Sequence, residues 1–334
     1  MFLEKEGKLI YSYDGETVCI EAWGKDALRV RATKNRSFTG RDWALEAKDA
    51  HAGEVEIFED PSAKGGAFAN MYEGTDTSYG KITNGKLHAV IDSGSVITFY
   101  HEDGRVLLKE HFRRLRDEES MPLNIMGREY SNGVGDNFRI VARFVARKGE
   151  KIFGMGQYQQ DFLNLKGADL ELAHRNSQAS VPFMISSLGY GFLWNNPAVG
   201  RVNFARNITT WEAFSSKKLD YWITAGDSPA EIEEAYAGVT GTVPMMPEYG
   251  LGFWQCKLRY QTQEELLSVA REYKRRGIKV DVIVIDYFHW PKQGDFRFDP
   301  TYWPDPDSMI QELKEMGIEL MVSIWPTVDY RSEN

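Results

Sequence analysis

The chain has 334 residues, of which 42% are hydrophobic and 27% are charged, a composition typical of a globular protein with one large domain or two smaller ones. Its formal net charge of −9 argues against a nucleic-acid backbone or an anionic membrane surface as a partner. Two cysteines in different parts of the chain (Cys19 and Cys256) and six scattered histidines provide neither a disulfide framework nor metal-ligand spacing, so we expect no bound metal.

Residues 1–226 are predicted to form an antiparallel β-sandwich domain. The first residues lack the long apolar core of a signal peptide, and no later window approaches a membrane span, so we expect a cytoplasmic protein. Apolar and polar residues alternate over residues 28–32 and 138–144, as in strands with one buried face. Hairpin-turn dipeptides such as Asn84-Gly85 separate runs of this kind, and many short strands with tight turns favour sheets packed face to face.

Three shorter segments of this half have simpler interpretations. Residues 61–80 are rich in Gly, Ser, Ala and Thr, which predicts a long surface loop. The basic run 113–116 is followed at once by the acidic residues 117–119, which indicates a self-neutralised surface turn. Gly154-Met155-Gly156 has too few glycines for a dinucleotide-binding fingerprint, and the sequence contains no P-loop, so we expect no cofactor.

A helical linker is predicted over residues 227–247, and a parallel α/β pattern over residues 248–334. Ser228 is a suitable helix cap before a proline, and Thr262 with Glu265 forms the signature of a capping box. The second segment alternates strand, helix, strand, helix, strand, with about three of the eight strands that close an α/β barrel. We therefore expect an N-terminal β-sandwich followed by the first βαβαβ part of a (β/α)8 barrel.

The carboxyl ends of the predicted barrel strands carry polar and aromatic residues, and ligands bind at these ends in parallel α/β folds. Asp286 directly follows the apolar run 280–285, where a carboxylate is costly unless it is hydrogen-bonded. Four rings follow Asp286. Sugar hydroxyls can donate to a carboxylate while the C–H faces of the sugar stack on rings, which favours a sugar site; a loop-capping aspartate beside packed aromatics is the structural alternative.

Other polar residues near these strand ends have weaker signals. Arg259 and Lys257 can reach the same mouth, although a role in an exposed loop fits them equally well. Asp295 and Asp299 fit the organisation of a turn better than they fit a binding site.

The same stretches resemble glycoside hydrolase family 31, in particular its α-xylosidase-like members. The matching barrel stretches are Gly252-Phe253-Trp254-Gln255, Ile285-Asp286-Tyr287-Phe288-His289-Trp290, Phe298-Asp299-Pro300, Trp303-Pro304-Asp305-Pro306 and Ile324-Trp325-Pro326. In the β half, residues 153–159 and 182–196 resemble the family as well. The resemblance implies further β domains after the barrel and retaining cleavage of α-linked glycosides, with two aspartates as nucleophile and acid/base at a carboxyl separation of about 5–5.5 Å.

The resemblance also assigns roles to individual residues. It implies that Asp286 binds hydroxyls of the nonreducing-end sugar, that Phe288 lines the same subsite, and that both catalytic aspartates lie beyond Asn334. The loop that begins at Gln157 would lean over the barrel mouth. Trp325 and Ser323 depart from the usual pattern, which leaves the sugar open. The expected substrate-binding residues are Asp286, Phe288, Trp290, Trp325, Arg259 and Gln157.

Together these features predict the front part of a retaining α-glycoside hydrolase that binds an oligosaccharide or glycoside, with α-xylosidase as the first choice. α-Glucosidase, α-galactosidase and α-N-acetylgalactosaminidase remain alternatives within the family. A noncatalytic carbohydrate-binding protein or an inactive fragment is the alternative from another class. We expect no glycosidase activity from these 334 residues alone, and assembly into a homo-oligomer remains open.

Overall fold

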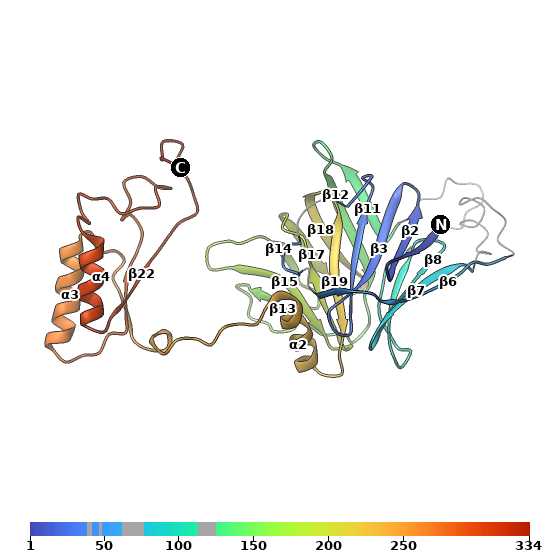
Figure 1. Cartoon of the computed structure of the whole chain (residues 1–334), viewed down its shortest axis with the longest axis horizontal. Helices are drawn as coiled ribbons and strands as arrows, with labels where there is room; N and C mark the ends of the chain where they lie inside the picture. The colour runs from blue at the N-terminus through green and yellow to red at the C-terminus, as the bar shows by residue number, and fades with distance from the viewer. Residues whose placement is uncertain (39–41, 47–48, 62–76, 113–124) are drawn as a thin grey trace. The chain divides into compact units, whose positions relative to one another are not determined.

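The computed structural model describes residues 1–38, 42–46, 49–61, 77–112 and 125–334. The chain forms two compact units, Met1–Thr242 and Val243–Asn334 (Figure 1). The predicted basic turn and most of the predicted loop at 61–80 lie outside the described residues. The end of that loop prediction is wrong, because Tyr79 and Gly80 begin strand β7 (Tyr79–Asn84).

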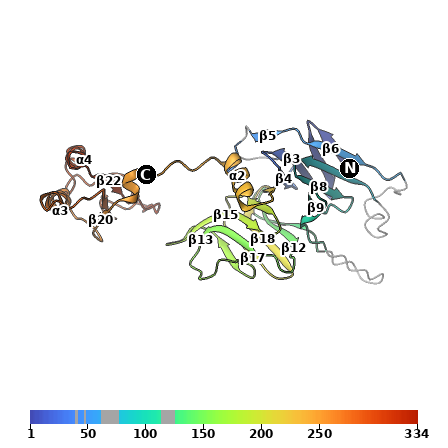
Figure 2. The same ribbon diagram turned by 90° about the horizontal axis from the view of Figure 1, so that it is seen from below.

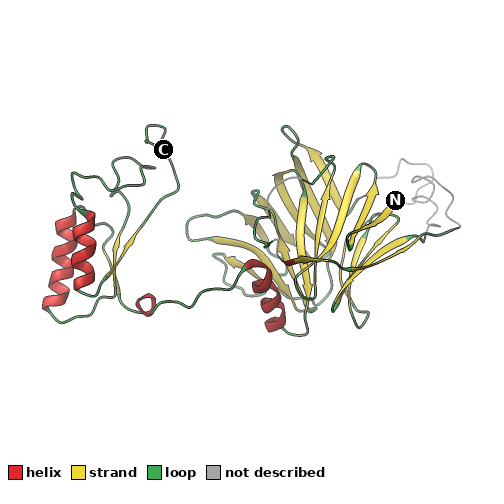
Figure 3. Cartoon of the chain, in the orientation of Figure 1, coloured by secondary structure: helices red, strands yellow, loops and turns green. Residues whose placement is uncertain are grey.

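The described part of the first unit consists mainly of antiparallel strands (Figure 3), which confirms the predicted β-sandwich. Its largest sheet contains β1 (Phe2–Lys5), β2 (Lys8–Tyr13), β3 (Glu16–Trp23), β4 (Ala27–Thr33), β19 (Leu219–Ala225), β16 (Tyr190–Trp194), β15 (Ala179–Ser186) and β13 (Ile152–Gln157) in this order, with β5 (Ala50–His51) paired to β3. A second sheet has the order β10 (Val106–Lys109), β9 (Ile97–His101), β8 (Leu87–Asp92), β7 and β6 (Glu54–Phe58). A third has the order β11 (Arg128–Asn132), β12 (Phe138–Val145), β18 (Ile208–Ser216), β17 (Gly200–Phe204) and β14 (Asp169–Leu172).

A common hydrophobic core is made by side chains from all three sheets. Leu9 of the first sheet, Ile82 of the second and Phe144 of the third are each almost fully buried in the same cluster. The apolar residues of the alternating stretch 28–32, which are Leu28, Val30 and Ala32, all belong to this core. Burial of these apolar rows against one another supplies the main driving force for closing the sandwich.

Strand β4 is buried on both faces, although its alternating pattern predicts one solvent-facing side. Arg29 is 0% exposed. Its guanidinium donates to both carboxylate oxygens of Asp220, at 2.9 and 2.6 Å, and lies 4.5 Å from the ring centroid of Trp23. A buried guanidinium is tolerated because carboxylates and a ring replace the water that it loses.

Helix α2 (Pro229–Thr240), labelled in Figure 2, belongs to the first unit, and it packs against β16 and β19. Ser228 caps it by accepting a hydrogen bond from the Glu231 backbone N–H, as the sequence predicts. Ile232 and Val239, which share one helical face, are buried in a cluster with Trp222. Because α2 packs on the sandwich, it lies within the first unit, which ends at Thr242. The sequence analysis instead placed this helix in a linker over residues 227–247.

The second unit has the predicted strand-helix alternation. The parallel strands β20 (Trp254–Cys256), β21 (Val282–Ile285) and β22 (Glu319–Val322) alternate with α3 (Gln263–Arg275) and α4 (Pro306–Glu315), and the 3-10 turn η2 (Glu248–Leu251) precedes them. Leu266, Ile283 and Leu313 are 0% exposed and belong to one core between the strands and the helices. This arrangement confirms the start of a (β/α)8 barrel as the second part of the fold.

The start of α3 agrees with half of the predicted capping box. The Thr262 hydroxyl accepts from the Glu265 backbone N–H at 3.1 Å. The Glu265 carboxylate, however, accepts from the backbone N–H of Gln261 at 2.7 Å, one residue before the cap. Within the described ranges, no helix has the length and apolar character needed to cross a membrane.

Candidate functional site

The carboxyl ends of the three barrel strands meet at one edge of their sheet. Cys256 lies opposite Val284, and Ile285 lies opposite Val322. The backbone N–H of Ser323 donates to the carbonyl oxygen of Ile285 at 2.9 Å, so the pairing of β21 with β22 continues one residue beyond β22. The loops that follow β20, β21 and β22 therefore start side by side, and their side chains can form one site.

Asp286 lies at this edge, directly after β21, and is partly buried. One of its carboxylate oxygens, Oδ1, accepts from the Tyr287 backbone N–H at 2.8 Å. No described residue donates to Oδ2. Burial raises the pKa of the neighbouring Cys256 thiol, and the negative charge of Asp286 adds to this effect. Asp286 thus orders its own loop with one oxygen and leaves the other able to accept from a ligand hydroxyl.

An aromatic cluster surrounds this edge, made from the loops after β21 and β22. The ring centroid of Trp325 lies 5.3 Å from that of Tyr287, 6.0 Å from Phe288 and 6.1 Å from Trp290. Phe288 is 52% exposed and Trp325 is 39% exposed, so both rings offer apolar area to a ligand. The structure thus brings together the predicted residues Phe288, Trp290 and Trp325, and adds Tyr287.

Phe288 has a strained backbone, with φ at +63°. A left-handed conformation costs a residue with a Cβ about 1–2 kcal/mol, and it is uncommon for a bulky side chain. Such strain persists only where surrounding contacts demand it, and it is concentrated at functional sites. The left-handed backbone of Phe288 accompanies a ring that packs within the aromatic cluster. The sequence contains no signal for this conformation.

Of the two cations expected near this mouth, Arg259 reaches the cluster. Its guanidinium carbon lies 5.6 Å from the ring centroid of Phe288, within the range of a cation–π contact. Lys257 instead pairs with Glu265 at the start of α3, with Nζ 2.5 Å from Oε1. Arg259 is therefore the cation placed to meet a ligand that rests on Phe288.

Two other loop carboxylates organise turns, as the sequence indicates. The Asp295 carboxylate accepts from the backbone N–H groups of Lys292 at 3.1 Å and Glu333 at 2.8 Å. Asp299 accepts from the Thr301 backbone N–H at 2.9 Å. Within the described residues, no group of three or more His, Cys, Asp or Glu side chains could hold a metal ion.

Gln157 belongs to the first unit, where it is the exposed last residue of β13, opposite Ala179 of β15. Its expected position over the barrel mouth stays a prediction. The nearby Gly154 and Gly156 permit close pairing of β13 with β15, since a Cβ on Gly156 would lie 2.3 Å from the Ala179 carbonyl oxygen. The close approach of β15 therefore explains why glycine stands at these two positions, without any nucleotide.

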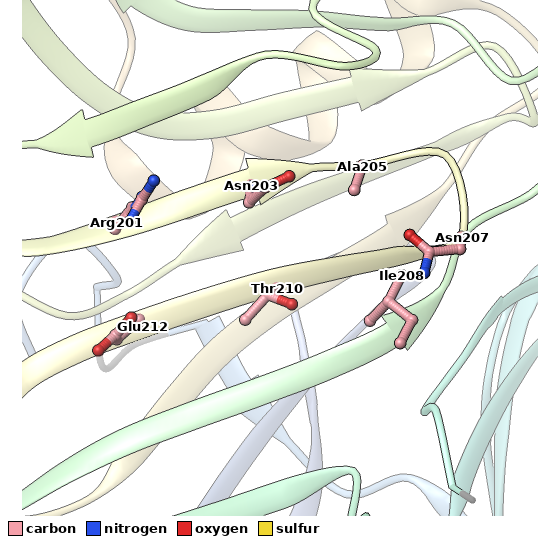
Figure 4. Close-up of a pocket in the computed structure, with 7 residues that line it drawn as sticks. All are labelled: Arg201, Asn203, Ala205, Asn207, Ile208, Thr210 and Glu212. Carbon is pink, nitrogen blue, oxygen red and sulfur yellow. The ribbon is translucent and has the colours of Figure 1, made fainter.

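A hollow of about 310 Å³ on the sandwich unit lies over strands β17 and β18 (Figure 4). Arg201 and Glu212, at one end of it, form ion pairs with Asp169 and Arg139 respectively. The described residues that line the hollow include no aromatic ring, so nothing there resembles the cluster at the barrel edge: they are Arg201, Asn203, Ala205, Asn207, Ile208, Thr210 and Glu212.

His289 is the buried member of the loop after β21, with 5% of its surface exposed. It lies between the rings of Trp290 and Phe298, at centroid distances of 4.7 and 5.2 Å. Its Nδ1 is 3.2 Å from the Asp286 carbonyl oxygen, so a neutral ring can donate to that oxygen. Burial lowers the pKa of His289, with the contact to Asp286 opposing the shift. The sequence identified this residue only as one ring among four.

We predict that His289 makes the second unit less stable in mild acid. The unfolded histidine takes up a proton near its usual pKa of about 6.5, while the folded one does so only at lower pH. Below about pH 6.5 the unfolded state therefore binds more protons, and the free energy of unfolding falls as the pH falls. Urea unfolding at several pH values should show this loss in the parent and a smaller loss in His289→Asn. Equal pH dependence of the two proteins would contradict it.

Comparison with protein families matches both units. The family model of the glycosyl hydrolase 31 N-terminal galactose mutarotase-like domain matches residues 17–203. The model of the glycosyl hydrolases family 31 TIM-barrel domain matches residues 243–334. The chain belongs to glycoside hydrolase family 31.

The individual relatives of this chain include named α-xylosidases. A protein described as an uncharacterized family 31 glucosidase from Pseudescherichia vulneris is 45% identical over 341 residues, which cover 99% of this chain and 61% of the relative. Alpha-xylosidase A of Aspergillus niger is 32% identical over 337 residues, 96% of this chain and 43% of that one. An α-xylosidase of Saccharolobus solfataricus is 36% identical over 208 residues, 59% of this chain and 28% of that one.

A solved family 31 structure shares this fold over the whole chain. The α-xylosidase from a soil metagenome, determined in complex with xylose, is 50% identical and superposes with a TM-score of 0.84. The match covers 100% of this chain and 48% of that protein. Where the match includes nearly all of this chain, it spans between 43% and 61% of the length of the relative.

Proposed function

We propose that the protein is a retaining α-glycoside hydrolase that removes α-linked xylose from the nonreducing end of a glycoside or oligosaccharide. The observation that carries this proposal is the placement of Asp286 beside the exposed rings of Phe288 and Trp325 at the strand ends. Similarity to α-xylosidases, one of them with bound xylose at 50% identity, supports xylose as the sugar.

In this proposal the described barrel residues bind and orient the sugar. The Asp286 carboxylate accepts hydrogen bonds from sugar hydroxyls through Oδ2, while Oδ1 holds the loop by accepting from Tyr287. Phe288 and Trp325 cover the C–H faces of the sugar and exclude water. Arg259 lies at the edge of the proposed sugar site, where its guanidinium contacts the ring of Phe288. We assign neither the nucleophile nor the acid/base to these residues; both are expected on aspartates beyond Asn334.

The test is hydrolysis of a panel of aryl α-glycosides by the full-length protein. We expect the largest kcat/KM with the α-xyloside, and smaller values with the glucoside, galactoside and N-acetylgalactosaminide. The 334-residue chain alone should show no turnover of any of them. A larger kcat/KM with another sugar would contradict the assignment of xylose, and turnover by the 334-residue chain would contradict the assignment of the catalytic residues.

α-Glucosidase is the second candidate, because the relative that matches 99% of this chain is described as a family 31 glucosidase. A preference for glucose would require space in the site for the extra hydroxymethyl group that distinguishes a glucosyl from a xylosyl unit. The same panel separates the two sugars directly.

A further inference from the structure

We infer that His289 is a positioning residue for the proposed sugar site: its ring holds the main chain at Asp286 and thereby sets the direction of the Asp286 carboxylate. This role rests on the function proposed above for that carboxylate. Four rings follow Asp286 along the chain, and His289 is the buried one among them, with 5% of its surface exposed. Burial leaves His289 little surface to offer a ligand, so it acts on the sugar through Asp286.

The His289 ring makes a hydrogen bond to the main chain of Asp286. Nδ1 of His289 lies 3.2 Å from the Asp286 carbonyl oxygen, and because such an oxygen only accepts, Nδ1 carries the proton. No other side chain and no backbone N–H among the described residues donates to this oxygen. Without the His289 donor, a partly buried acceptor would therefore lose its partner, which is costly.

His289 is itself fixed to the core of the second unit. Its ring lies between Trp290 and Phe298, at centroid distances of 4.7 and 5.2 Å. Its backbone carbonyl oxygen accepts from the Asp299 backbone N–H at 2.8 Å. The ring of Phe298 in turn lies 5.7 Å from that of Trp303, which is 2% exposed in the core. These contacts hold the His289 ring in place, so it can act as an anchor for Asp286.

The turn over residues 286–289 needs such an anchor, because Phe288 within it has φ at +63°. A bulky residue in this left-handed conformation is strained, and the strain persists only where the surroundings demand it. The bond from the Tyr287 backbone N–H to Asp286 Oδ1 joins two neighbouring residues, so it ties the carboxylate to the turn but does not tie the turn to the core. If the turn relaxed, Asp286 Oδ2 would move, and a displacement of about 1 Å can slow a reaction about 100-fold.

The test compares His289→Leu with His289→Asn in the full-length protein. The two new side chains have the same branched shape, and both lack the imidazole that packs against Trp290 and Phe298. Only asparagine can place an N–H where Nδ1 lies, whereas leucine is the more favourable residue at a buried position. We expect kcat/KM for an aryl α-xyloside to fall about tenfold in His289→Leu and to stay within about threefold of the parent in His289→Asn. A purely structural role would favour leucine.

A double-mutant cycle shows whether His289 acts through the carboxylate. In the Asp286→Ala background the carboxylate is absent, so the added change His289→Leu should lower kcat/KM by about twofold at most. The matched background is Asp299→Asn, which keeps the carboxylate of Asp286. There the same change should still lower kcat/KM about tenfold.

Amide hydrogen exchange of the same full-length variants gives a second measurement, which requires no turnover. A peptide that covers residues 286–290 should exchange at least about fivefold faster in His289→Leu than in the parent, because the turn is no longer tied to the core. In His289→Asn it should exchange as in the parent. Thermal melting of each variant establishes that it is folded.

The role of His289 is overturned if His289→Leu keeps the parent kcat/KM, or if His289→Asn loses as much as His289→Leu, since ring packing would then account for the loss. Equal losses in the parent and Asp286→Ala backgrounds would also overturn it, because His289 would then act independently of the carboxylate. A preference for another aryl α-glycoside contradicts only the proposed xylose specificity, and the variants are then compared on that sugar. If the protein hydrolyses none of the glycosides, the proposed function fails and hydrogen exchange alone decides: unchanged exchange over 286–290 in His289→Leu overturns the role.

Discussion

Asp286→Asn is expected to lower kcat/KM for an aryl α-xyloside by about 10- to 150-fold in the full-length protein. Hydrogen bonds to a charged group contribute about 1.5–3 kcal/mol, and each 1.4 kcal/mol corresponds to a factor of about ten. The asparagine keeps an oxygen that can accept from the Tyr287 backbone N–H, so the loop should retain its shape. The loss should therefore come from weaker hydrogen bonds to the sugar hydroxyls, and it is measured by steady-state kinetics.

Asp299→Asn is the matched control for this prediction. Asp299 also accepts from a backbone N–H in a loop of the same unit, at 2.9 Å from Thr301, but it organises a turn. We expect its kcat/KM to stay within about twofold of the parent value, the scale of a surface change of up to about 0.5 kcal/mol. Equal losses for Asp286→Asn and Asp299→Asn would show that Asp286 acts only by ordering its loop.

Arg128→Met is expected to destabilise the sandwich unit strongly. Arg128 lies in β11 and is 7% exposed. Its guanidinium donates to both oxygens of Glu16, at 2.9 and 3.0 Å, and pairs with Glu110. It also donates to the Ser95 hydroxyl at 2.7 Å. Glu16 begins a strand of the first sheet and Glu110 follows the last strand of the second, so Arg128 joins all three sheets.

Removal of Arg128 would leave two buried carboxylates without their cation. Breaking a buried ion pair in this way costs about 3–5 kcal/mol. For a unit of this size, that loss corresponds to a Tm lowered by about 6–20 °C, as differential scanning calorimetry would measure. The cost arises from uncompensated charge, and it does not imply that the original pairs contribute the same amount of net stability.

Arg139→Met provides the comparison at the surface of the third sheet, the sheet that contains Arg128. Arg139 pairs with Glu212 across β12 and β18, but its side chain is 55% exposed. An exposed pair of this kind contributes about 1 kcal/mol or less, so its Tm should change little. If the two arginine variants melted at the same temperature, burial of the cluster around Arg128 would not have the predicted energetic effect.

Several local features could be predicted from the sequence because neighbouring residues create them. Ser228 and Thr262 cap helices α2 and α3 as expected, and Asp305 caps α4 in the same way, since each side chain accepts from a backbone N–H three residues later. Asp14-Gly15 lies between β2 and β3 with φ at 46° and 72°, as a tight hairpin turn of this type requires. The parallel strands follow from short apolar runs between helices.

Interactions between distant residues were not accessible in the same way. Arg29 looks like a solvent-facing strand residue, but Asp220, 191 positions later, makes its burial tolerable. The partner Glu16 of Arg128 is 112 positions away. Helix α2 shows an apolar face in its sequence, yet nothing local indicates that this face packs on the sandwich. The left-handed conformation of Phe288 likewise depends on the surroundings of its loop.

The candidate site likewise contains some features that neighbouring residues create and others that depend on distant residues. Asp286 and its aromatic neighbours could be identified from sequence alone, because a carboxylate after a buried strand, followed by rings, is a local pattern. Trp325 and Arg259 were expected at the same site, but only the tertiary structure shows that Trp325, 39 positions after Asp286, lies against the ring of Phe288, and that Arg259 rather than Lys257 contacts that ring. Local sequence sets backbone preferences and caps, whereas side chains meet across strands only once the parallel register of β20, β21 and β22 aligns their ends.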